Sequence, residues 1–258
     1  MHLIFIRHGD PDYKNDTLTE KGRREAALLA ERVSKWKVDD FYVSPYGRAQ
    51  DTIAPVLEMT GRTAETIEWL HEFDWRVTDP LTKQPRGAWD WLPRVYYSEK
   101  KYFSRWDWFK SKVMKSGGIE SHAQKVCSGF DSILTQYDYT RMDSDIPVYS
   151  CFPHLTEEDA RVDTHLNPHQ KDLDDKNLVF VCHLGVMFVI ISHLTGLSPV
   201  QLWQGFFVAP TSVTVLGAEE RVPGEVVFRV QQLGDVSHLT QHGEDASASG
   251  FYGNFLNL

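Results

Sequence analysis

The sequence predicts an α/β protein, a three-layer α/β/α sandwich around a mostly parallel central sheet. Two observations lead to this fold class. Short apolar runs that are typical of buried strands alternate along the chain with segments whose apolar residues recur at helical spacing. The 258 residues, 41% of them hydrophobic, are also sufficient to build one large core. We therefore expect a single domain over residues 1–258, with residues 74–176 inserted into it as a largely helical, aromatic-rich cap.

The first part of the chain supplies strands and helices in alternation. An apolar run rich in β-formers ends at residues 7–11, where Gly9 and Pro11 favour a loop. Thr19 has the side chain of a helix N-cap, and Pro55 lies inside the next helix, which it could kink. The elements expected here are strands at residues 3–6, 41–43 and 64–70 and helices at residues 20–36 and 48–59.

The middle of the chain differs in composition. Five of the eight tryptophans lie between Trp75 and Trp108, alongside tyrosines and phenylalanines. Such a stretch is more often the core of a small helical cap than a stacking platform, although some rings of a cap must border the cleft beneath it. A helix at residues 121–137 and a polar loop around residues 147–170 complete this segment.

The last part of the chain returns to the pattern of buried strands and helices. A glycine at position 196 closes the first of its helices, and Pro223 and Gly224 join two closing strands. The elements expected here are strands at residues 178–182, 213–216 and 226–230 and helices at residues 186–194 and 198–203.

Composition and charge argue against several classes of protein. Lys and Arg number 27 against 36 Asp and Glu, and this net charge of -9 does not suit a protein that binds nucleic acid or an anionic membrane. No stretch approaches the roughly 20 apolar residues of a membrane-spanning helix. Three widely spaced cysteines and an N-terminus without the features of a signal peptide indicate a reducing compartment, so we expect a cytoplasmic protein.

Polar residues follow three of the expected strands at the point where each strand ends. Arg7 and His8 follow the first strand, Arg48 lies just beyond the second, and His183 follows the strand at residues 178–182. Ligands of open α/β sheets bind outside the carboxyl ends of the strands, so these side chains are expected to converge. Arginine recognises phosphate oxygens with several donors, and a neutral imidazole is a competent nucleophile near pH 7. The arrangement suits a phosphoryl group.

The tripeptide Arg7-His8-Gly9 after an N-terminal strand resembles the signature of the histidine phosphatase superfamily, also called phosphoglycerate mutase-like. Further segments are similar to motifs of that family in the same order, over residues 1–72 and roughly 178–240. They are Leu18-Thr19-Glu20-Lys21-Gly22, Ser44-Pro45-Tyr46-Gly47-Arg48-Ala49-Gln50-Asp51-Thr52, Leu70-His71-Glu72, and Val181-Cys182-His183 with Gly185-Val186. Ordered motifs at strand ends are far more specific than one tripeptide.

The resemblance implies a role for each matching residue. His8 attacks phosphorus in line and becomes phosphohistidine, while Arg7, Arg48 and His183 hold the transferring oxygens. Glu72 protonates the leaving alkoxide and then helps to deprotonate the attacking water. Phosphoryl transfer needs positioning and charge neutralisation, which cationic side chains supply, so neither a metal nor another cofactor is expected. A small phosphorylated substrate is expected in the site, which inorganic phosphate or sulfate could also occupy.

The chain departs from the family pattern at a few positions. Leu184 stands where the family commonly has a glycine after the second histidine, and this leucine either adds bulk near the phosphate or points into the sheet. Asn15 and Thr17 are candidates for a further phosphate-binding polar residue in the first loop, without a preference for either. Asp74 competes with Glu72 as the acid, and the spacing after Leu70 favours Glu72.

Other histidines have less specific surroundings. His154, His165 and His169 invite a metal-site interpretation, but Pro168 disfavours a shared helix face for the last two. No carboxylate or cysteine completes a regular ligand pattern around them in the sequence, so no metal is expected there. His238 follows the last expected strand and is interpreted as structural.

The expected function is a metal-independent phosphatase acting on a small phosphorylated metabolite. A phosphoglycerate mutase is one alternative, but the extra segments of the family's dedicated mutases are not recognisable here. A protein phosphatase and a non-catalytic module that binds a phosphorylated ligand are further alternatives, and the four charged pocket residues argue against the module. An apolar edge around the closing strands could support a homodimer.

Overall fold

The computed structural model describes residues 1–143, 145–155, 176–253 and 255–257, and among them eight strands form one sheet. The first four strands in spatial order run parallel to one another, and the fourth then pairs antiparallel with the fifth. In spatial order the strands are β5 (Glu65–Thr66), β4 (Asp40–Val43), β10 (Asn177–Cys182), β1 (His2–Arg7), β11 (Val213–Val222), β12 (Glu225–Asp235), β9 (Tyr149–Ser150) and β8 (Thr140–Arg141). The expected α/β class with a parallel core is confirmed. The sheet continues antiparallel because a tight turn at Gly224 joins β11 to β12, and such a hairpin admits no other direction.

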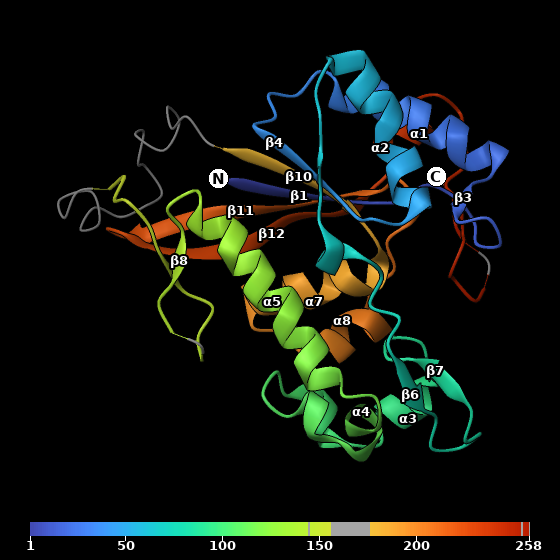
Figure 1. Cartoon of the computed structure of the whole chain (residues 1–258), viewed down its shortest axis with the longest axis vertical. Coiled ribbons are helices and arrows are strands. Elements are labelled where there is room, and N and C mark those ends of the chain that lie inside the picture. Colours follow the sequence, from blue (N-terminus) through green and yellow to red (C-terminus); the bar gives the residue numbers. More distant parts are fainter. Residues whose placement is uncertain (144, 156–175, 254, 258) are drawn as a thin grey trace.

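Helices cover both faces of the parallel strands and make three layers (Figure 1). On one face lie α1 (Glu20–Val33) and α2 (Gly47–Thr60), and on the other lie α5 (Ile119–Thr135), α7 (Leu184–Thr195) and α8 (Pro199–Gly205). Successive residues of β1 lie on opposite faces of the sheet, with Leu3 and Phe5 in one core cluster and Ile4 and Ile6 in the other. Burial on both faces explains why β1 and β10 have continuous apolar runs rather than alternation.

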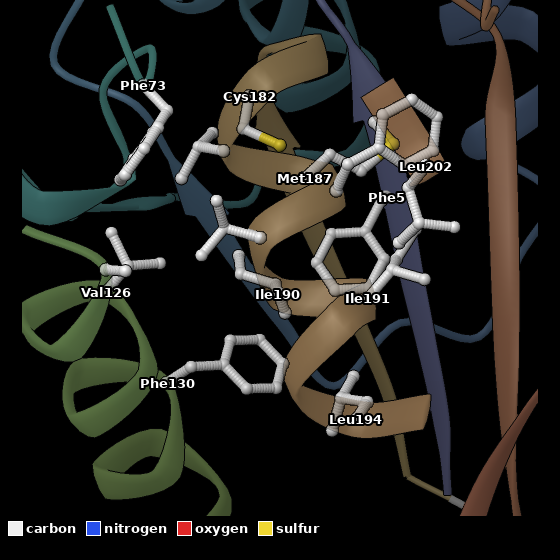
Figure 2. Close-up of a cluster of buried hydrophobic side chains, with 14 of the residues drawn as sticks. Phe5, Phe73, Val126, Phe130, Cys182, Met187, Ile190, Ile191, Leu194 and Leu202 are labelled. Carbon is white, nitrogen blue, oxygen red and sulfur yellow. The ribbon is translucent and has the colours of Figure 1, made fainter. Parts of the chain in front are cut away.

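The helix α7 is buried around almost its whole circumference. Figure 2 shows it between α5 on one side and β1 on the other, with Met187, Ile190 and Ile191 directed into the apolar cluster. The ring of Phe130 on α5 lies 5.2 Å from that of Phe180 and 6.0 Å from that of Phe5, so α5 is tied directly to the sheet. This packing holds the N-terminus of α7 against the carboxyl end of β10.

The ends of the helices agree with the sequence signals, with small shifts. The hydroxyl of Thr19 accepts a hydrogen bond from the amide of Gly22 and caps α1 as expected. The helix α2 begins at Gly47 and continues through Pro55 to Gly61, whose positive φ of 65° terminates it. The strand expected at residues 64–70 is shorter, because Ile67 and Leu70 are both buried at a spacing of three, which a 3-10 turn at Glu68–Leu70 provides.

The middle segment, residues 74–176, contains both helices and strands where the structure describes it. Its strands β8 and β9 extend the central sheet, and its aromatic rings join the same core cluster as α7 and α8. Trp108, for example, lies with its ring 5.6 Å from that of Trp203 on α8. Besides α5, β8 and β9, the segment holds β6 (Arg76–Thr78), β7 (Pro85–Gly87), α3 (Pro93–Tyr96), α4 (Lys112–Ser116) and 3-10 turns at Lys100–Phe103 and Trp108–Lys110. Its role as a cap remains a prediction.

Smaller elements complete the description. The pair β2 (Pro11–Asp12) and β3 (Thr17–Leu18) forms a short ribbon in the first loop, and α9 (Ser237–Thr240) follows β12. His238 on α9 is buried with its Nε2 3.2 Å from the hydroxyl of Thr211, which agrees with a structural interpretation. No helix in the described parts of the chain is long and apolar enough to span a bilayer.

Candidate active site

The carboxyl ends of three neighbouring strands bring the expected polar residues together. Arg7 at the end of β1 is paired in register with Cys182 on β10, and the amide of His8 donates to the carbonyl of Cys182 at 2.9 Å. The amide of Ser44, just after β4, donates in turn to the carbonyl of Val181. The convergence that the sequence indicated is therefore present at one edge of the sheet.

His8 is buried and has a defined ring orientation. Its Nδ1 lies 2.8 Å from the carbonyl oxygen of Gly9, so Nδ1 donates and the lone pair is at Nε2. Burial, together with the positive charges of Arg7 and Arg48, lowers the pKa of His8 well below its usual range. At neutral pH the ring is thus an uncharged imidazole with an available nitrogen nucleophile.

His183 lies beside His8, with the two ring centroids 5.1 Å apart. Its Nε2 is 2.7 Å from the hydroxyl of Ser44, and its Nδ1 is buried without a hydrogen-bond partner among the described residues. Burial and the neighbouring His8 lower its pKa. The contact with Ser44 was not expected, since the sequence places Ser44 in the second-arginine motif but carries no signal that its hydroxyl reaches across to β10.

Each of the two arginines has one buried nitrogen without a hydrogen-bond partner among the described residues. Arg7 donates to the carbonyls of Val208 and Ser249 at 2.8 and 2.9 Å, and Arg48 pairs with Asp16 and lies over the ring of Tyr46 at 4.7 Å. The Nε atoms of both arginines are buried without a partner in the described structure. Unpaired buried donors are costly, so these N–H groups and His183 Nδ1 indicate a place for an anion.

Asp16 is a site residue that the sequence interpretation missed. It adopts a positive φ of 49°, and its carboxylate accepts from the amide of Gly47 at 2.7 Å as well as from Arg48. A Cβ at Gly47 would lie 2.1 Å from the Asp16 carbonyl oxygen, so this approach requires glycine. The two candidates on either side of Asp16 are engaged elsewhere, because Asn15 donates to Asp12 and Thr17 donates to Asp51.

Glu72 and Asp74 differ sharply in their surroundings. Glu72 is buried, and its Oε1 accepts from the amide of Phe73 at 2.6 Å and from the amide of Val186, in the first turn of α7, at 3.2 Å. Burial nevertheless raises the pKa of this carboxyl group, with the amides of Phe73 and Gly185 and the charge of Arg48 opposing the shift. Asp74 is exposed at the rim. The geometry therefore suits Glu72 better than Asp74 for carrying a proton.

Leu184 has a simple place in the structure. Its side chain is buried in the core cluster around α7 and does not belong to the lining of the cavity. Of the two orientations considered from the sequence, it adopts the one away from the phosphate region.

A cavity of about 630 Å³ opens beside His8, Arg48 and Glu72, whereas Arg7 and His183 are not among its lining residues. The middle segment contributes part of its wall, and the end of the chain contributes another part, for which the sequence held no signal. The described residues that line it are His8, Tyr13, Asp16, Tyr46, Arg48, Glu72, Asp74, Trp89, Asp90, Gly250, Phe251 and Tyr252. The volume is suitable for a small molecule.

One further group of side chains could hold a metal ion. Single ligand atoms of Cys151, His154 and Glu220 all lie within 4.8 Å of one another, away from the cavity. The Glu220 carboxylate accepts hydrogen bonds from the amides of His154 and Gly224, so it also fixes the loop without a metal. The sequence did not indicate this group because Glu220 is distant along the chain. His165 and His169 lie outside the described residues.

Comparison with known proteins shows which family the chain matches and which solved structures share its fold. Residues 3–104 and 135–231 match the model of the histidine phosphatase superfamily (branch 1). A probable phosphatase of Schizosaccharomyces pombe is 38% identical over 68 residues, which is 23% of this chain and 32% of that protein. The chain thus matches about a third of the length of this curated relative.

Several solved structures share the fold. A phosphoserine phosphatase of Entamoeba histolytica in complex with 3-phosphoglyceric acid has a TM-score of 0.56 at 17% identity, covering 92% of this chain and 98% of that one. The alpha-ribazole phosphatase of Shigella flexneri has a TM-score of 0.52 at 20% identity, covering 92% and 97%. A mycobacterial glucosyl-3-phosphoglycerate phosphatase in complex with VO3 has a TM-score of 0.51 at 16% identity, covering 90% and 98%. At such identities the likeness concerns the fold.

Proposed function

The chain belongs to the histidine phosphatase superfamily, and from this we propose that it is a phosphomonoesterase that forms a phosphohistidine on His8 and acts on a small phosphorylated metabolite. One observation carries the proposal. The neutral His8 ring keeps its Nε2 lone pair and lies 5.1 Å from the ring of His183, and Arg7 Nε, Arg48 Nε and His183 Nδ1 are buried without partners in the described structure. A nucleophile together with unpaired buried donors suits an incoming phosphoryl group. The similar structures named as phosphatases of small phosphorylated compounds support this substrate class.

In the first step, His8 Nε2 attacks phosphorus as the ester P–O bond breaks. The two arginines neutralise charge on the non-bridging oxygens, which is the main requirement of this loose transition state, and the uncharged His183 ring adds a hydrogen bond. If the Ser44 hydroxyl donates to His183 Nε2, then Nδ1 carries the proton and donates to one of these oxygens. Ser44 is then a positioning residue.

The leaving oxygen needs a proton when it belongs to an alkyl ester. Glu72 supplies it, because burial raises the pKa of its carboxyl group and keeps it protonated to a higher pH. In the second step, the Glu72 carboxylate takes a proton from water, the water oxygen bonds to phosphorus, and the N–P bond breaks. Inorganic phosphate leaves, and His8 and Glu72 return to their initial states. The cations of the side chains make a metal unnecessary in this scheme.

A panel of phosphorylated metabolites and an aryl phosphate, assayed for release of inorganic phosphate, tests the proposal. The wild type is expected to release phosphate in the presence of a chelator and to form an acid-labile phosphoenzyme. The variant His8→Ala is expected to lose both, while His242→Ala, which removes a partly exposed imidazole outside the cavity, retains both. Equal inactivity of wild type and His8→Ala on every ester contradicts the proposal, and transfer of the phosphoryl group to phosphoglycerate rather than water favours a mutase.

A further inference from the structure

The wall of the cavity beyond the phosphate-binding residues is acidic and aromatic. Asp74 and Asp90 contribute the carboxylates, and Tyr13, Trp89 and Tyr252 contribute rings. We propose that the site selects phosphate esters whose leaving group carries a positive charge, such as a primary amine or a substituted ammonium group. This inference rests on the proposed phosphomonoesterase activity and adds the class of its substrate.

The carboxylates of Asp74 and Asp90 are available for a ligand. In the described chain, neither makes a side-chain hydrogen bond or an ion pair, in contrast to Asp16, which pairs with Arg48, and Glu72, which binds two backbone amides. Arg48 is also the one Lys or Arg among the described residues of the lining. Negative charge therefore exceeds positive charge on this wall, and a cationic group on the leaving side finds partners there.

The aromatic residues favour the same kind of group. Tyr252 is 89% exposed although it belongs to the lining, so its ring is accessible to a ligand. Tyr13 is 61% exposed, and Arg48 lies over one face of its ring at 5.5 Å, which leaves the opposite face. Ring faces attract ammonium groups electrostatically, and exposed aromatic rings grouped at one cavity are typical of a binding surface.

The same wall discriminates against a leaving group that carries a second negative charge. A carboxylate or phosphate on that side would lie near Asp74 and Asp90, and the arginines are already committed to the phosphoryl oxygens or to Asp16. Like charges placed together are unfavourable and give specificity by exclusion. Sugar acid phosphates are thus expected to be poor substrates.

Three aryl phosphates of matched shape test the inference: 4-(aminomethyl)phenyl, 4-methylphenyl and 4-(carboxymethyl)phenyl phosphate. The carbon spacer keeps the charge away from the phenol oxygen, so the chemistry of the leaving oxygen stays similar. We expect the wild-type kcat/KM for the amine to exceed that for the methyl compound about tenfold, from the exposed Asp74, the half-buried Asp90 and the rings together. The carboxylate compound is expected to fall below both.

The double variant Asp74→Asn with Asp90→Asn removes the charge and keeps the shape. Its ratio of kcat/KM for the amine to kcat/KM for the methyl compound is expected to fall to about two, because the aromatic rings still attract the ammonium group. Asp138→Asn, a matched change at an exposed carboxylate outside the cavity lining, is expected to leave the ratio at its wild-type value. A ratio near one in the wild type, or one that the double variant does not lower, overturns the inference while the hydrolysis itself upholds the phosphatase proposal. Absence of hydrolysis of all three esters overturns the phosphatase proposal instead.

Discussion

The variant Gly185→Ala tests the position of Glu72 without changing any ionisable group. Gly185 lies in the first turn of α7, and a Cβ there would be 2.5 Å from Glu72 Oε1 and 2.7 Å from Cδ1 of Trp89. Non-bonded atoms prefer a separation of about 3.5 Å or more, so the carboxylate must withdraw by about 1 Å. Alanine is a better helix former than glycine by about 1 kcal/mol, which offsets part of the strain, and the fold is expected to persist.

The magnitude follows from the displacement. A misplacement of about 1 Å at a catalytic group costs about 100-fold in rate, or roughly 2.7 kcal/mol of transition-state stabilisation. This loss is expected for an alkyl phosphate, whose leaving oxygen requires the proton of Glu72. A nitrophenyl phosphate leaves without protonation, so its rate of phosphoenzyme formation is expected to fall by no more than about threefold.

The single-turnover rate of phosphoenzyme formation from each of the two esters, measured with Gly185→Ala and with Gly205→Ala, checks the reasoning. Gly205 at the end of α8 has no atom within 4 Å of an added Cβ, so it is the matched control and is expected to behave as the wild type. An equal loss on both esters, or no loss on the alkyl ester, would refute the assignment of Glu72 as the acid.

Three further predictions concern side chains around the site and in the core. Ser44→Ala leaves Nε2 of buried His183 unpaired, so kcat should fall about tenfold or more in phosphate-release assays, and an unchanged kcat would contradict its positioning role. Burial raises the pKa of Glu25 from 4.5 to about 7, so the folded protein holds this proton longer than the unfolded chain does. The free energy of unfolding should therefore fall by about 3 kcal/mol as pH rises from 4.5 to 7. In urea unfolding, Glu25→Gln should remove this pH dependence, and a pH dependence that persists in the variant would contradict the role of Glu25. Phe130→Ala should lower the free energy of unfolding by about 3–5 kcal/mol, because the ring is fully buried against Phe5 and Phe180, and a loss below about 1 kcal/mol would be inconsistent with that packing.

Much of the fold could be predicted because buried strands and amphipathic helices leave periodic patterns in the chain. Burial on both faces gives β1 and β10 continuous apolar runs, and burial on one face gives α1 its helical spacing of apolar residues. Both are local signals in the sequence. The antiparallel extension through β8 and β9 was not predicted. Two-residue strands carry no periodic pattern, and their pairing depends on contacts with β12 far along the chain.

The candidate site divides in the same way. Arg7, His8 and His183 directly follow apolar runs, so their common edge could be predicted from the sequence. Asp16 and Ser44 could not be singled out, since their importance lies in reaching Arg48 and His183 across the fold.

The middle segment shows what composition can and cannot settle. Its tryptophans marked an unusual region, but their individual environments depend on packing. Trp91 and Trp108 are buried in the core shared with α7 and α8, whereas Trp89 lines the cavity beside Asp90. A single residue, Asp90, lies between the cavity ring of Trp89 and the core ring of Trp91, and no local pattern distinguishes the two tryptophans.

The sequence by itself determined the α/β class and the set of phosphate-binding candidates, because both depend on short segments whose burial and polarity are local properties. The tertiary structure alone decided which groups complete the site. It buries Glu72 against the N-terminus of α7, leaves Asp74 at the rim, and brings residues 250–252 over the cavity. These outcomes depend on contacts between parts of the chain that are far apart in sequence, and such contacts set the burial, the charge balance and the pKa values that the chemistry requires.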